Sequence, residues 1–132
     1  MSTIPAVAVA PTTLAEAIDV IEETYEFMLA FAAQGRRHEE DGDGIRERLK
    51  RAEAALTIIA SATTEGIGGG DTAEFFEVLK QDAVRARAAF RFVIAQASLG
   101  SQIVDNLNAS THVRTLLTDL FLLDEALKIS GI

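Results

Sequence analysis

The sequence predicts an all-α protein: an antiparallel bundle of four helices with a long third helix. Along four segments of the 132 residues, apolar side chains recur at alternating steps of three and four, which keeps one face of a helix buried. Cap residues or glycines bound these segments, and no segment alternates with the period of two expected for a strand. The hydrophobic content of 48% is typical of a packed globular chain.

Residues 1–12 precede the helical-bundle domain, which we place at residues 13–132. This segment is apolar, but it carries no basic residue and Pro5 interrupts it, so it lacks the pattern of a signal peptide. No apolar run in the chain approaches the roughly 20 residues that a membrane-spanning helix needs. We therefore interpret residues 1–12 as a flexible arm and expect no membrane association.

The first helix begins at Thr13, because Thr13 and Glu16 have the spacing of a capping box. Gly35 is a typical stop after it. A second apolar stripe flanks the first, and so wide a face indicates burial on more than one side. The two stripes consist of Leu14, Ile18, Ile21, Tyr25, Met28 and Ala32, and of Ala17, Val20, Phe27 and Phe31.

Charged residues and glycines fill residues 36–44, which predicts a solvated loop. The second helix follows this loop, and the glycines of residues 66–70 end it with a flexible turn. Its apolar face consists of Ile45, Leu49, Ala52, Leu56 and Ile59.

The third helix is predicted from Asp71, which forms a cap pair with Glu74, to Leu107. Gly100 lies inside it and costs about 1 kcal/mol relative to alanine. The three-four register nevertheless continues across Gly100, so we expect one helix roughly 54 Å long, bent at this glycine. The alternative is a break at Gly100 that folds the chain into a compact monomer. The stripe consists of Phe76, Leu79, Ala83, Ala86, Phe90, Val93, Ala97, Gly100, Val104 and Leu107.

The last helix is capped by Ser110 or Thr111 and buries Val113, Leu116, Leu120, Leu123 and Leu127. The three shorter helices cover only parts of a long third helix, so apolar surface would stay exposed and we expect a twofold homodimer. Substitution of Phe92 by aspartate is expected to weaken self-association more than helicity. The predicted interface residues are Phe27, Phe31, Phe75, Phe92, Leu99, Ile103, Leu117 and Phe121.

Composition excludes several classes of function. The chain has no cysteine, hence no disulfide and no thiolate nucleophile, which fits a cytoplasmic location. Its net charge of -8 disfavours nucleic acids and anionic membranes. No Glu-x-x-His occurs, so a dinuclear carboxylate site has no support.

The acidic loop resembles the opening of a calcium-binding loop only superficially. Asp41 and Asp43 have the right spacing, but Lys50 stands where the closing glutamate belongs. His38 in this loop and His112 near the start of the last helix lack the partners of a catalytic triad. We expect no catalytic residue, no metal and no cofactor.

The sequence therefore favours a non-catalytic interaction module: an adaptor, a chaperone-like binder or an accessory subunit that binds a protein partner. Arg87, Arg91 and Arg114 are the candidate contacts for an acidic partner or ligand. The alternative function is binding of a small molecule in an apolar pocket between helices. That pocket would lie beside Ala83, Ala86, Ala97 and Gly100, where small side chains leave room.

Overall fold

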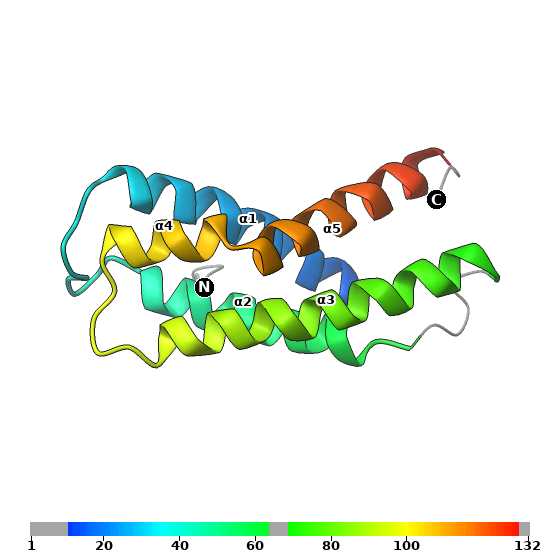
Figure 1. Cartoon of the computed structure of the whole chain (residues 1–132), viewed down its shortest axis with the longest axis horizontal. Helices are drawn as coiled ribbons and strands as arrows, with labels where there is room; N and C mark the ends of the chain where they lie inside the picture. The colour runs from blue at the N-terminus through cyan, green and yellow to red at the C-terminus, as the bar shows by residue number, and fades with distance from the viewer. Residues whose placement is uncertain (1–10, 64–68, 130–132) are drawn as a thin grey trace, which may run out of the picture.

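The computed structural model describes residues 11–63 and 69–129 and, at the carboxyl end, side chains to residue 126. Regular secondary structure in these ranges is entirely α-helical, which confirms the all-α class, but it comprises five helices where the sequence predicted four (Figure 1). Most of the predicted arm, residues 1–10, lies outside the described residues. The helices are α1 (Leu14–Ala33), α2 (Ile45–Ser61), α3 (Asp71–Ile94), α4 (Ser101–Ala109) and α5 (Thr111–Ile129).

The five helices form four rods. In Figure 1, α1 and α3 run in one direction along the long axis, and α2 runs in the other. α4 and α5 run in the direction of α2 and together make the fourth rod, which is interrupted at Ser110. Among the described residues, no helix combines the length and the apolar character needed to cross a bilayer.

The prediction of one long third helix is wrong. α3 ends at Ile94, Gly100 is the extended residue before α4, and α4 turns back along the bundle (Figure 1). α4 packs mainly against α1, while α5 packs mainly against α3. Part of the apolar surface that a long helix would have left uncovered is therefore covered within the chain, although Val78 and Phe92 stay exposed. The argument from helix length for a homodimer no longer holds.

Hydrogen bonds from a residue distant in sequence end α3 before Gly100. The Arg46 side chain on α2 donates hydrogen bonds to the carbonyls of Ile94 and Gln96, which would otherwise lack partners at the end of α3. The Gln96 side chain donates a third, to the Phe92 carbonyl at 2.9 Å. On the far side of the break Val104 and Leu107 of the predicted stripe are buried, whereas Ala97 in the turn is exposed.

Local capping was predicted in part. Thr13 and Glu16 form the expected capping box of α1. The hydroxyl of Ser110 accepts a hydrogen bond from the Val113 amide at 3.3 Å, which caps α5. Asp71 does not cap α3, because the helix already includes Asp71 and the cap residue is Gly70.

One hydrophobic core runs through the bundle. All five helices contribute to it, and Met28, Leu56, Phe76, Leu99 and Leu120 are among its large buried side chains. Ala83 and Ala86, which we expected beside a pocket, are completely buried in this core. Their small size lets α2 and α3 approach closely rather than leaving space for a ligand.

Substitution of Gly100 by alanine distinguishes the observed turn from a continuous helix. A Cβ atom at residue 100 would lie 2.5 Å from the Arg37 carbonyl oxygen and 2.9 Å from that of Arg36. We therefore expect Gly100→Ala to lower the free energy of unfolding by about 1–3 kcal/mol, measured by chemical denaturation. In a continuous helix the same change would raise it by about 1 kcal/mol.

Gly69→Ala is the matched control, because no atom lies within 4 Å of a Cβ atom built there and the backbone of Gly69 is not left-handed. We expect it to change stability little. An increase in stability for Gly100→Ala would contradict the turn.

Candidate functional site

The two loops at the left-hand end of Figure 1 are tied together by charged side chains. The Glu39 carboxylate contacts the Arg46 guanidinium at 2.6 Å and accepts a hydrogen bond from the Leu99 amide at 3.1 Å. The guanidinium of Arg46 and the amide of Leu99 both lower the pKa of Glu39, and the hydrogen bond from Arg46 has the largest effect. Glu39 therefore joins the loop after α1 to the loop after α3.

Residues expected to form a solvated loop thus stabilise the fold. Arg36 pairs with Asp43, whose side chain is nearly buried and also accepts a hydrogen bond from the Glu40 amide at 2.6 Å. Of the loop carboxylates that resembled calcium ligands, Asp43 is thereby engaged with an arginine and a backbone donor. Within the described part of the chain, no group of three His, Asp or Glu side chains has an arrangement that would hold a metal ion.

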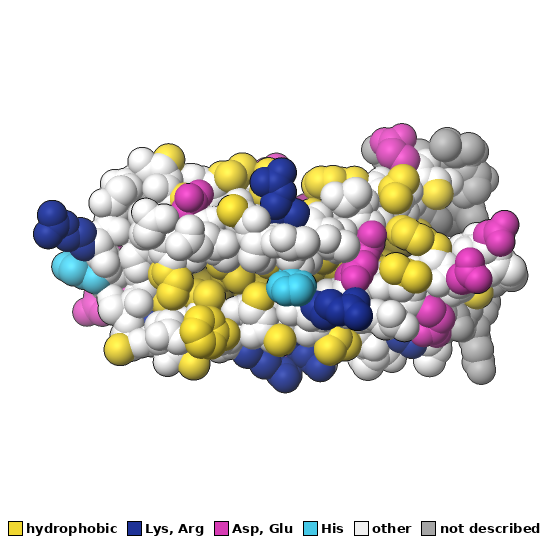
Figure 2. Space-filling view, in the orientation of Figure 1, with side chains coloured by type: hydrophobic (Ala, Val, Ile, Leu, Met, Phe, Trp, Pro, Cys, Tyr) yellow, Lys and Arg dark blue, Asp and Glu magenta, His cyan; other side chains and the backbone are white. Residues whose placement is uncertain are grey.

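The predicted arginine contacts do not form one cluster. Arg91 pairs with Glu53 of α2 at 2.6 Å, and Arg87 lies 3.4 Å from the Thr57 hydroxyl. Both arginines therefore join α3 to α2, and Figure 2 shows basic side chains along that edge. Arg114 differs: it is exposed on α5, and its side chain has no hydrogen bond or ion pair with any described residue.

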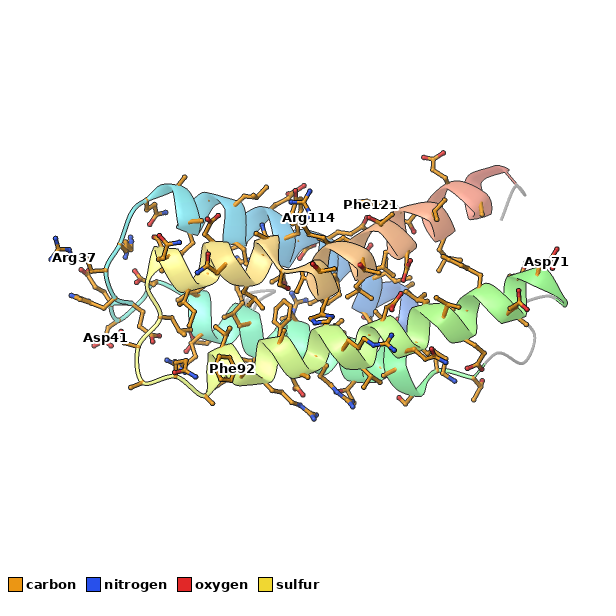
Figure 3. All side chains as sticks on the ribbon, in the orientation of Figure 1. Arg37, Asp41, Asp71, Phe92, Arg114 and Phe121 are labelled. Carbon is orange, nitrogen blue, oxygen red and sulfur yellow. The ribbon has the colours of Figure 1, made fainter. Side chains whose placement is uncertain are left out.

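The predicted interface residues separate into buried and exposed groups. Phe31, Leu99 and Leu117 are buried in the core of the chain itself, and the Arg48 guanidinium lies 4.3 Å from the centre of the Phe27 ring. Phe75 and Ile103 are half-buried. Phe92 and Phe121 remain exposed, at 68% and 46% of their surface, and lie on opposite edges of the bundle in Figure 3.

Phe92 belongs to the first of two exposed apolar surfaces, which we call the α3 outer surface. It consists of Val78, Val84 and Phe92, all exposed. At about 100° per residue these three positions lie within a sector of roughly 120° on α3. Arg85 and Arg91 flank them, and each is already engaged, with Asp82 and Glu53 respectively.

Phe121 belongs to the second surface, a hollow of about 230 Å³ that we call the three-helix hollow. Each of three helices contributes residues spaced three or four apart, which lie on one helix face. These residues are Tyr25 and Leu29 of α1, Asp105, Asn108 and Ala109 of α4, and Arg114, Leu117, Thr118 and Phe121 of α5. Figure 3 shows Arg114 and Phe121 on the edge where α5 passes α1.

Asn108 is the residue of this hollow that sequence reasoning missed. It is 93% buried inside α4, and its side-chain oxygen has no hydrogen-bond partner. The signal was present: Asn108 follows Val104 by four residues and so shares its buried stripe. An unpaired buried carbonyl costs about 1–3 kcal/mol, so a donor at this position would be favourable.

A larger hollow of about 900 Å³ adjoins the first one, and Leu29 and Asp105 line both. It lies between the end of α1 and α4, with Arg37 at its rim and Ala97 and Gly100 in its wall. Of the small residues predicted to border a ligand pocket, only Ala97 and Gly100 lie at a hollow. Arg87 and Arg91, the predicted ligand contacts, do not line it.

Asp119 of α5 is a buried acidic residue that meets Asp82 of α3. Burial and the neighbouring Asp82 carboxyl together raise the pKa of Asp119 to about 7, and burial is the larger cause. One oxygen of Asp119 has no hydrogen-bond partner. Asp82 in turn lies 3.2 Å from the Arg85 guanidinium. Two carboxyl groups therefore meet at the contact between α3 and α5, and a proton on Asp119 removes the repulsion between them.

Comparison of the chain with protein-family models, with curated proteins and with solved structures gave no significant match.

The raised pKa of Asp119 predicts how stability depends on pH. The folded chain retains a proton on Asp119 up to about pH 7, whereas the unfolded chain loses it near pH 4. This group therefore lowers the free energy of unfolding as the pH rises from about 4 to about 7. Asp119→Asn removes that dependence, and at pH 8 we expect it to be more stable than wild type by roughly 1–3 kcal/mol.

The measurement is urea denaturation at several values of pH. Asp19→Asn, a change at an exposed carboxylate of α1, is the control and should retain the pH dependence of wild type. An Asp119→Asn variant that follows the wild-type curve from pH 4 to pH 8 would show that Asp119 ionises normally.

Proposed function

We propose that this chain is a non-catalytic interaction module: a homodimer that serves a larger assembly as an adaptor, a chaperone-like binder or an accessory subunit. The observation that supports the proposal is the pair of exposed apolar surfaces on opposite edges of one bundle (Figure 3). One surface accommodates a second copy of the chain, and the other accommodates a protein partner.

The apolar side chains of these surfaces favour binding of another protein over exposure to solvent. Full burial of a phenylalanine or leucine side chain is worth about 1.5–3 kcal/mol, a gain that the isolated chain forgoes at Phe92 and at Leu122. Leu29 and Phe121 are each about half exposed and line the same hollow, so they form a patch rather than isolated apolar residues. Aromatic and aliphatic anchors beside a hollow are typical of interaction surfaces.

The acidic balance of the chain agrees with this function. A net charge of -8 keeps the chain soluble despite its exposed apolar side chains and favours partners with basic surfaces. The absence of cysteine suits a reducing compartment, and we propose that the module acts in the cytoplasm.

Light scattering coupled to size-exclusion chromatography tests the homodimer. At low micromolar concentration we expect a mass of twice the 14.2 kDa of one chain, because burial of exposed apolar side chains between two copies favours the dimer. A mass of 14.2 kDa that persists up to about 100 µM would contradict self-association.

A further inference from the structure

We propose that the three-helix hollow is the surface through which two copies of this chain associate, with Phe121 of each copy inserted into the hollow of the other. The inference rests on the proposed function, because it assigns the homodimer to one of the two apolar surfaces. It is supported by shape and by charge.

The first support is shape. Phe121 projects from the rim of a hollow of about 230 Å³, and Leu29 on the opposite wall is 47% exposed. A projection and a hollow thus lie side by side on one surface. A twofold axis brings the projection of each copy to the hollow of the other, which is the geometry of an isologous interface. Leu122, next in the chain, is 57% exposed and would extend the contact.

The second support is charge. Asp105 of α4 and Arg114 of α5 both line the hollow, and neither side chain has a hydrogen bond or an ion pair with any other described residue. A twofold axis pairs Asp105 of one copy with Arg114 of the second copy, and the reverse pair forms with it. Because each chain carries a net charge of -8, association needs such local complementarity to offset the repulsion.

The α3 outer surface offers less to a second copy. Arg85 and Arg91 beside it are already paired with Asp82 and Glu53 of the same chain, so no unpaired acid and base face outwards together there. It is the surface that remains for a different protein partner. From the sequence we expected Phe92→Asp to weaken self-association. It now serves as the variant with which Arg114→Asp is compared.

Charge reversal and restoration test the assignment. Arg114→Asp places like charges opposite each other in both symmetric pairs, so we expect it to raise the dimer dissociation constant about tenfold or more. The double variant Asp105→Arg, Arg114→Asp restores opposite charges across the axis, and its dissociation constant should return to within about threefold of wild type. Sedimentation equilibrium measures all three constants.

Two further variants serve as controls. Arg37→Asp makes the same change in net charge at an exposed arginine that does not line the three-helix hollow, and it should leave the dissociation constant within about threefold of wild type. Circular dichroism checks folding, and aspartate in the first turn of α5 is compatible with a helix start. Phe92→Asp should leave the dimer intact.

The outcomes separate the two proposals. A wild-type dimer that is weakened by Phe92→Asp but not by Arg114→Asp overturns the assignment to the hollow and leaves the homodimer standing. A dimer equally weakened by Arg37→Asp, or not restored by the double variant, also overturns the assignment. A wild-type chain that stays monomeric at all concentrations overturns the homodimer itself.

Discussion

The fold depends on a contact between the end of α1 and the start of α4. The Ser101 amide donates a hydrogen bond to the Arg36 carbonyl at 2.7 Å, and the Ser101 hydroxyl donates one to the Phe31 carbonyl at 2.7 Å. The Arg36 amide donates to the same hydroxyl at 2.8 Å. Backbones approach this closely only because residue 100 has no side chain. These bonds hold α4 against α1, and the continuation of the chain as α5 follows from that placement.

Formation of the three-helix hollow depends on the same contact. Because α4 lies on α1 and the fourth rod is interrupted at Ser110, α5 leaves the interruption beside α1, and the three helices enclose the hollow between them (Figure 1). The interruption also places Arg114 one turn into α5, across the hollow from α1. A continuous α3 would have carried Asp105 and Asn108 away from Tyr25 and Leu29. The surface that we assign to self-association is thus a consequence of the reversal.

Much of the fold could be predicted from local pattern. The α-helical class, the capping box at Thr13 and the buried stripes of the helices follow from spacing alone. The end of α3 could not be predicted in this way, because Val104 and Leu107 continue its three-four spacing beyond the break and are buried as that spacing predicts. What ends the helix is Arg46, which lies 48 residues away from Ile94 in the sequence. The pairing of the loop carboxylates with arginines could not be predicted from local pattern either, because these residues become neighbours only on folding.

The candidate site was less accessible to sequence reasoning than the fold. The sequence singled out Phe121, Leu117 and Arg114, and the structure places all three at one hollow. It grouped Arg114 with Arg87 and Arg91, which instead bind α2. It had no means to find Asp105, because the importance of that residue depends on which helices meet.

The reversal after α3 is tested most directly by one distance. The chain has no cysteine, so spin labels on Asp71→Cys and Ala109→Cys report a single intramolecular pair by double electron–electron resonance when the labelled chain is diluted in excess unlabelled chain. With α3 reversed into α4, the labels should lie roughly 25–35 Å apart, since α4 returns along part of α3. A distance of about 57 Å, that of a continuous helix over these residues, would contradict the reversal and with it the three-helix hollow.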